Sequence, residues 1–99
     1  MTNNIELVFN KMITNLAGNR FGKDVYIEQI EKKIDINQKN IVIFPVQIED
    51  IASSFIEGIY KVLGERYGKL NALEIMELHA ENEETQEKID DSIKTFGVF

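Results

Sequence analysis

Residues 41–44 are isoleucine, valine, isoleucine and phenylalanine, so every position of this run is β-branched or aromatic. Such a run favours a β-strand that is covered on both faces. The only proline of the chain follows at position 45. Because proline has no amide hydrogen, it predicts that the strand ends there or lies at an edge. We therefore expect an interior strand over residues 41–44 that ends near Pro45.

The residues after the proline have the periodicity of an amphipathic helix. The pattern predicts a helix over residues 54–67 that packs on the sheet, and Gly68 is a suitable C-terminal stop. Its apolar positions are spaced by three and four residues: Ile56, Ile59, Tyr60, Leu63 and Tyr67. Ser54 and Glu57 have the spacing of a capping box, which predicts Ser54 as the N-cap.

The rest of the chain alternates between strand and helix patterns. Residues 5–9 and 71–78 predict strands, and residues 20–34 predict a helix with Asn19 as its N-cap. A last helix is expected after Asn82, which is a second N-cap. The apolar positions expected to face the sheet are Ile27, Ile30 and Ile34 in the earlier helix and Ile89, Ile93 and Phe96 in the last one.

This order of strands and helices predicts an α/β fold. The expected sheet is small, mixed or mostly parallel, with helices packed on it, because strands that alternate with helices are usually joined by right-handed crossovers. A chain of 99 residues has room for one core. We therefore expect a single domain over residues 1–99.

The charge of the chain limits its partners. Seventeen acidic against eleven basic residues give a formal net charge of -6 at pH 7. This charge argues against a nucleic acid or an anionic membrane as partner and favours a basic protein. The chain has no leader pattern and no apolar run near the roughly 20 residues that span a bilayer. We therefore expect a cytoplasmic protein, and the lack of cysteine excludes disulfides.

The sequence offers few groups for catalysis. His79 is the only histidine, so a serine triad would depend on this one side chain. Glu77 and Glu81 flank it, but carboxylates beside one histidine at a strand end are more often a solvated turn than a metal site. The glycine-containing segment 16–23 lacks the spacing of a phosphate-binding loop. We therefore expect no enzymatic activity, no metal and no other cofactor.

Two adjacent serines, Ser53 and Ser54, stand where the predicted helix begins. Serine is among the residues that most often start a helix, so local chemistry favours a capping role for both. The alternative is a phosphorylation site. A phosphate on Ser53 would add about -1.5 to -2 charge at a helix N-terminus, beside Glu49 and Asp50. The residues alone leave both interpretations open.

Residues 41–63 resemble the STAS-like domain family, small bacterial domains of largely unassigned function. Residues 41–43 match the valine-rich strand of that family, and residues 53–55 match its serine-rich helix opening. The same stretch is more distantly similar to the anti-sigma factor antagonists, STAS proteins in which a partner kinase phosphorylates a serine of this turn. Ser53 falls on that serine. The acid and the glycine that flank the serine pair in those proteins are replaced here.

The resemblance implies a STAS-like fold and a non-enzymatic, regulatory role in protein binding. Its implied partner is a kinase-like ATPase or another regulator, in a partner switch. The expected contact surface is the turn at residues 49–54 with the helix that follows it: Glu49, Asp50, Ser53, Ser54 and Glu57. The alternative prediction is a small acidic inhibitor that mimics nucleic acid or blocks a basic enzyme surface. The eleven bases mixed among the acids favour the docking module over the inhibitor.

Overall fold

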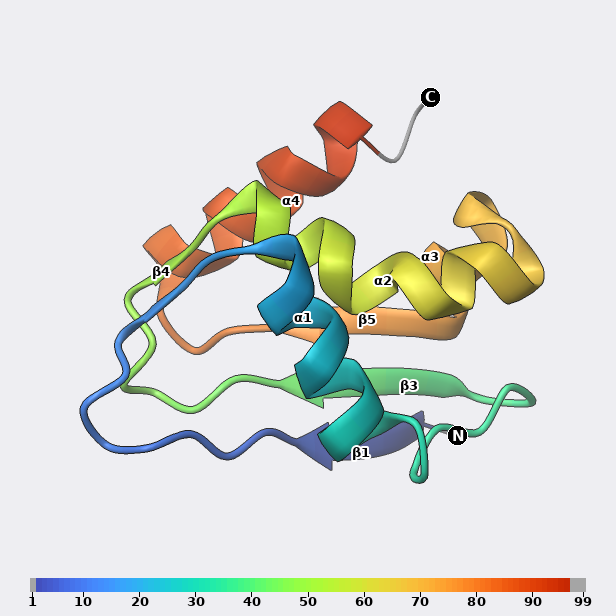
Figure 1. Ribbon diagram of the computed structural model, residues 1–99, viewed down its shortest axis with the longest axis horizontal. Coiled ribbons are helices and arrows are strands. Elements are labelled where there is room, and N and C mark those ends of the chain that lie inside the picture. The colour runs from blue at the N-terminus through green and yellow to red at the C-terminus, as the bar shows by residue number, and fades with distance from the viewer. Residues whose placement is uncertain (1, 97–99) are drawn as a thin grey trace.

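Three parallel strands form the central sheet (Figure 1). The computed structural model describes residues 2–96 of the chain. The strands lie side by side in the order β1, Thr2–Glu6, then β3, Lys39–Ile43, then β5, Met76–His79. In the central strand, Val42 pairs in register with Ile5 on one side and Leu78 on the other. The predicted α/β fold and the predicted interior strand are therefore confirmed.

The helices cover one face of this sheet (Figure 1). They are α1, Asn19–Val25, with its π-helical continuation η1, Tyr26–Ile30; α2, Ser53–Tyr67; α3, Lys69–Ile75; and α4, Glu83–Phe96. The strands follow one another in one direction across the sheet, so both right-handed crossovers bring their helices to the same face. The strand residues under the helices are buried: Ile5, Leu7, Val42, Phe44, Met76 and Leu78.

No helix or strand within residues 2–96 covers the opposite face of the sheet, which corrects the expectation that residues 41–44 are covered on both faces. Ile41 and Ile43 point to this face and are only partly buried, and the neighbouring His79 is exposed. Most parallel sheets have crossovers on both sides and are covered twice. Here both crossovers lie on one side, so none of the described elements is left to cover the other face.

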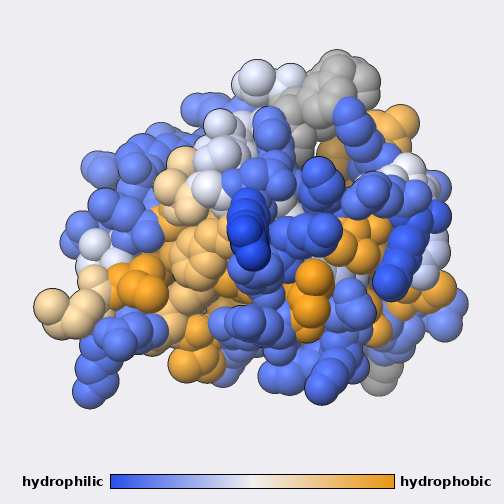
Figure 2. Space-filling model, viewed as in Figure 1, coloured by the Kyte–Doolittle hydropathy of each residue, from blue (hydrophilic) through white to orange (hydrophobic). Residues whose placement is uncertain are grey.

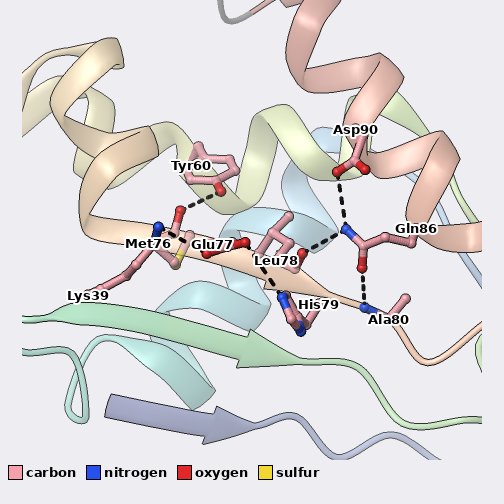
Figure 3. Close-up of polar contacts among 9 residues, drawn as sticks. All are labelled: Lys39, Tyr60, Met76, Glu77, Leu78, His79, Ala80, Gln86 and Asp90. Atoms are coloured by element: carbon pink, nitrogen blue, oxygen red, sulfur yellow. Dashed lines mark hydrogen bonds and ion pairs between the residues drawn. The ribbon is translucent and has the colours of Figure 1, made fainter. Parts of the chain in front are cut away.

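Helix α2 confirms its prediction. The four residues predicted to face the sheet are all buried: Ile56, Ile59, Tyr60 and Leu63. Gly68 ends the helix with a positive φ of 89°, while Tyr67 beside it is exposed. The Tyr60 hydroxyl donates to the Met76 carbonyl at 2.7 Å, which attaches the helix to β5 (Figure 3). Burial raises the pKa of Tyr60 far above its ordinary value, so the hydroxyl remains a donor.

The first helix differs from its prediction in its cap and in its register. Gly18, with a φ of 99°, takes the N-cap position predicted for Asn19, and no side chain caps the helix. The chain then continues as a π-helix, in which the Glu31 amide donates to the Tyr26 carbonyl at 2.9 Å. Tyr26 follows the buried Gly22 and Val25 at α-helical spacing and lies in the core, which leaves Ile27 43% exposed, although the sequence pattern predicts Ile27 inside.

The prediction of one strand over residues 71–78 is wrong. These residues form most of a helix and then a shorter strand that begins at Met76. The positive φ of Gly68 lets the chain turn after α2 and begin α3 at once. Leucine, alanine and glutamate in this segment favour a helix, and Ala72 is buried against the core. Strand β1 likewise begins before the predicted residues 5–9.

Helix α4 confirms Asn82 as its N-cap, because the Glu84 amide donates to Asn82 Oδ1 at 2.9 Å. Ile89 is buried, and Ile93 packs against the core as predicted. The side chain of Phe96, predicted on the same face, lies outside the described residues.

Helices α1 and α2 cross with their backbones in contact, and two glycines make this possible. A Cβ atom on Gly22 would overlap the Phe55 carbonyl oxygen and lie 2.8 Å from the Ile59 nitrogen. A Cβ atom on Gly58 would overlap the Asn19 carbonyl oxygen. Backbone atoms in a packed interior cannot move aside cheaply. Glycine is therefore required at both positions.

Gly58→Ala should lower the free energy of unfolding by about 1 to 3 kcal/mol, because the added methyl group forces the two helices apart. Gly64→Ala is the matched control in the same helix, since a Cβ atom there meets no atom within 4 Å. It should raise the free energy of unfolding by up to about 1 kcal/mol, because alanine favours a helix over glycine. Urea melts measure both changes. Shifts of the same sign would contradict the close helix contact.

Candidate functional site

The turn at residues 49–54 is attached to the segment before α1 by backbone hydrogen bonds. Strand β4, Asp50–Ile51, pairs in parallel with strand β2, Asn15–Leu16. Just before this pair, the Glu49 amide donates to the Thr14 carbonyl at 2.7 Å. Just after it, the Ala52 amide donates to the Leu16 carbonyl at 2.8 Å. The turn is therefore held from Glu49 to Ala52 on this side.

Helix α4 holds the same turn from the other side. The buried Thr85 hydroxyl donates to the Glu49 carbonyl at 2.8 Å. Lys88 Nζ lies 2.9 Å from Asp50 Oδ1, and this hydrogen bond together with the charge of Asp50 raises the pKa of Lys88. The ion pair is half-exposed, so water screens it and its contribution to stability is small. The predicted contact residue Asp50 is thus already paired within the protein.

A glutamine near the start of α4 attaches this helix to the sheet (Figure 3). Gln86 Oε1 accepts from the Ala80 amide at 2.7 Å, and Gln86 Nε2 donates to the Leu78 carbonyl at 3.1 Å. Both bonds go to the end of β5 and the residue after it. The side-chain amide therefore joins the start of α4 to the central sheet, and through α4 it supports the turn.

The predicted capping box at Ser54 is wrong. Ala52 is the N-cap, with an extended backbone (φ -74°, ψ 150°), and no side chain caps α2. The Ala52 carbonyl accepts from the Phe55 amide at 3.1 Å, so the helix begins before Ser54. The Ser54 hydroxyl instead accepts a hydrogen bond from the Gly18 amide at 3.0 Å. Ser54 therefore joins the start of α2 to the start of α1.

Phe55 shows which side of this first turn faces the core. Its ring is fully buried and makes edge-on contacts with Phe21, at 5.4 Å between centroids, and with Phe44, at 6.2 Å. Once this ring is in the core, the residue two positions before it, Ser53, lies on the outside of the helix. The side chain of Ser53 is exposed.

Ser53 lies at the edge of a shallow groove between α2 and α4. The groove has a volume of about 250 Å³, and its lining residues are Ser53, Glu57, Asp91, Ser92 and Thr95. Of the five predicted contact residues, Ser53 and Glu57 meet in this groove. Glu49 is exposed on the turn, Asp50 is paired with Lys88, and Ser54 is turned toward Gly18.

The sequence predicts only the cap and the sheet-facing side of α4, and therefore misses its groove residues. Asp91, Ser92 and Thr95 meet the start of α2 only because the tertiary fold brings the two helices together. Their spacing on one side of a helix is a signal that sequence reasoning can use only once the partner helix is known.

A second missed feature is an apolar tip formed by the loops after β1 and β3. Val8, Met12 and Val46 are mostly exposed there, and Figure 2 shows hydrophobic side chains gathered over this end of the molecule, on the left of the view. Gln47 Nε2 donates to the carbonyls of Asn10, at 2.7 Å, and Ile13, at 2.9 Å, which joins the two loops. Clustered exposed apolar residues are typical of protein-interaction surfaces.

His79 lies on the open face of the sheet and away from the serines. The carboxylate of Glu77 lies 3.5 Å from His79 Nε2 and 3.2 Å from Lys39 Nζ (Figure 3). Within residues 2–96, no cluster of three or more histidine, cysteine or acidic side chains could hold a metal ion. In the same part of the chain, no helix is both long and apolar enough to cross a membrane.

Comparison with known proteins found no family model, no curated protein and no solved structure that matches the chain. The similarity of residues 41–63 to the STAS-like family therefore stays a prediction from the residues that carry it.

Ser54→Ala should lower the free energy of unfolding by about 0.5 to 1.5 kcal/mol, because the Gly18 amide loses its acceptor. The amide proton of Gly18 should move upfield in the NMR spectrum, while the first-turn amides of α2 keep their shifts. Ser53→Ala is the control and should change neither. A shift of the Glu57 amide instead of the Gly18 amide would mean that Ser54 caps its own helix.

Proposed function

We propose that this protein is a non-enzymatic regulatory module that docks a protein partner through the turn at residues 49–54 and the start of α2. The docking surface consists of Glu49, Ser53 and Glu57, extended by Asp91 and Ser92 of α4. Asp50 and Ser54 support it through their contacts with Lys88 and Gly18. The observation that carries the proposal is that the turn is hydrogen-bonded on both sides while Ser53 and Glu57 stay exposed. A surface that is already ordered loses little conformational entropy when it binds.

The chemistry of the groove favours a partner that supplies hydrogen-bond donors. The carboxylates of Glu57 and Asp91 accept hydrogen bonds, and the hydroxyls of Ser53 and Ser92 can accept them too. Lysine or arginine side chains fit this pattern, and the net charge of -6 would speed their approach. The apolar tip next to the turn adds surface that a protein can cover and a nucleic acid cannot use.

Phosphorylation of Ser53 is the regulatory step in this proposal. A phosphate there would carry about -1.5 to -2 charge and would fill the groove between Glu57 and Asp91. A partner that closes over the groove would have to desolvate this charge beside two other carboxylates, which is costly. The modified protein would release its partner. A kinase-like ATPase is the enzyme class that the resemblance implies, and because such an enzyme uses ATP, we propose that the protein acts in the cytoplasm.

Ser53→Asp should weaken partner binding about tenfold, which is about 1.4 kcal/mol, because it adds a carboxylate beside Glu57 and Asp91. Ser53→Ala should bind almost as the wild type does, and both variants should melt like the wild type. Thr2→Asp, an exposed residue on β1, is the matched control for added charge. Captured partners are identified by mass spectrometry, and their affinities are then measured by calorimetry. Equal binding of all four proteins would remove Ser53 from the docking surface.

An acidic inhibitor is the second candidate, and the exposed residues around α4 favour it. Six of them are acidic: Glu81, Glu83, Glu84, Glu87, Asp90 and Asp91. An inhibitor that presents these groups to a basic enzyme surface would compete with nucleic acid for that enzyme and would bind much more weakly at high salt. Ser53→Asp would then leave binding unchanged or strengthen it. The same set of variants therefore separates the two functions.

A further inference from the structure

The exposed side of α2 and the beginning of α3 border a second groove. It has a volume of about 370 Å³, and its charged lining residues are Glu57, Lys61, Glu65 and Lys69. All four side chains are exposed. This groove begins one helical turn beyond Ser53 and runs away from the turn at residues 49–54.

Gly64 lies in this groove and has no packing role within the molecule. A glycine inside a helix lowers stability by about 1 kcal/mol relative to alanine. At Gly58, in the same helix, this cost is explained by the close contact with Asn19, whereas a Cβ atom on Gly64 would meet no atom within 4 Å. The groove therefore contains a stretch of bare helix backbone that another helix could approach closely.

The charge pattern along this groove is complementary to that of a second copy of the chain. Lys61 and Glu65 lie about one turn apart on the exposed side of α2. A second copy that lies antiparallel can place Lys61 of each copy opposite Glu65 of the other, while a parallel copy in the same register places like charges together. This pattern points to a second copy of the chain as the occupant of the groove.

We propose that two copies of the protein associate antiparallel along α2, about a two-fold axis near Gly64. The aliphatic stem of Lys61 lies across the bare backbone at Gly64 of the second copy, and its ammonium group reaches Glu65 of that copy. The same contact is repeated by symmetry, as in any isologous dimer.

This dimer is expected to be weak and sensitive to salt. One helix face buries less than the roughly 1,200 Å² at the lower end of stable interfaces, and exposed ion pairs are screened as the ionic strength rises. The inference does not rest on the proposed docking function, although Glu57 lies on both surfaces. Ser53 lies beyond the end of this interface.

Sedimentation equilibrium of the full chain at low salt tests the dimer. The wild type should show a monomer–dimer equilibrium with a dissociation constant on the order of 0.1 mM. Lys61→Glu and Glu65→Lys should each raise this constant at least about tenfold, because every reversal places like charges together at two symmetric contacts. The double variant restores opposite charges at both contacts and should dimerise within about threefold of the wild type.

Two further variants separate the interface from general charge effects. Gly64→Leu should abolish dimers without loss of stability, since its side chain enters the groove and not the core. Lys11→Glu makes the same charge change as Lys61→Glu on a distant exposed loop and should leave the dissociation constant unchanged. A wild type that stays monomeric up to about 1 mM, or a double variant that fails to restore dimers, would overturn the proposal.

Discussion

The backbone contact between α1 and α2 is the constraint on which the rest of the structure depends. Gly22 and Gly58 allow the two helices to cross without side chains between them. This crossing brings the beginning of α1 to the beginning of α2, where the Gly18 amide meets the Ser54 hydroxyl. It also aligns β2 with β4, and so fixes the turn that precedes α2. The candidate docking surface is thus a consequence of helix packing. The buried ring of Phe55 attaches the end of this turn to the core.

Where local chemistry decides the structure, the sequence is a good guide. The strand at residues 41–44, the buried face of α2 and the cap at Asn82 all follow from patterns within a few residues. The predictions fail where contacts between distant parts of the chain decide the structure. Residues 71–78 were predicted as one strand, but the turn at Gly68 and the core contact of Ala72 favour a helix first. The open face of the sheet follows from the side on which two crossovers pass, and no local pattern encodes that side.

The two serines illustrate the same division. Both fit a helix start, and the sequence alone favoured Ser54 as the cap. The structure begins the helix at Ser53 and uses Ser54 to hold Gly18, a residue far away in the sequence. Ser53 is left exposed, and its groove is completed by Asp91 and Ser92 from the last helix. Sequence reasoning could identify Ser53 but not these two neighbours, because only the packing of α4 against α2 brings them together.

The proposed docking surface requires that the turn at residues 49–54 is ordered before any partner binds. Native-state amide hydrogen exchange at Glu49 and Ala52 measures this, since both amides donate to the segment before α1. Both amides are expected to exchange only when the whole protein unfolds, with opening free energies within about 1 kcal/mol of the global value. Exchange through local opening at less than about 2 kcal/mol would show a mobile turn and contradict the claim.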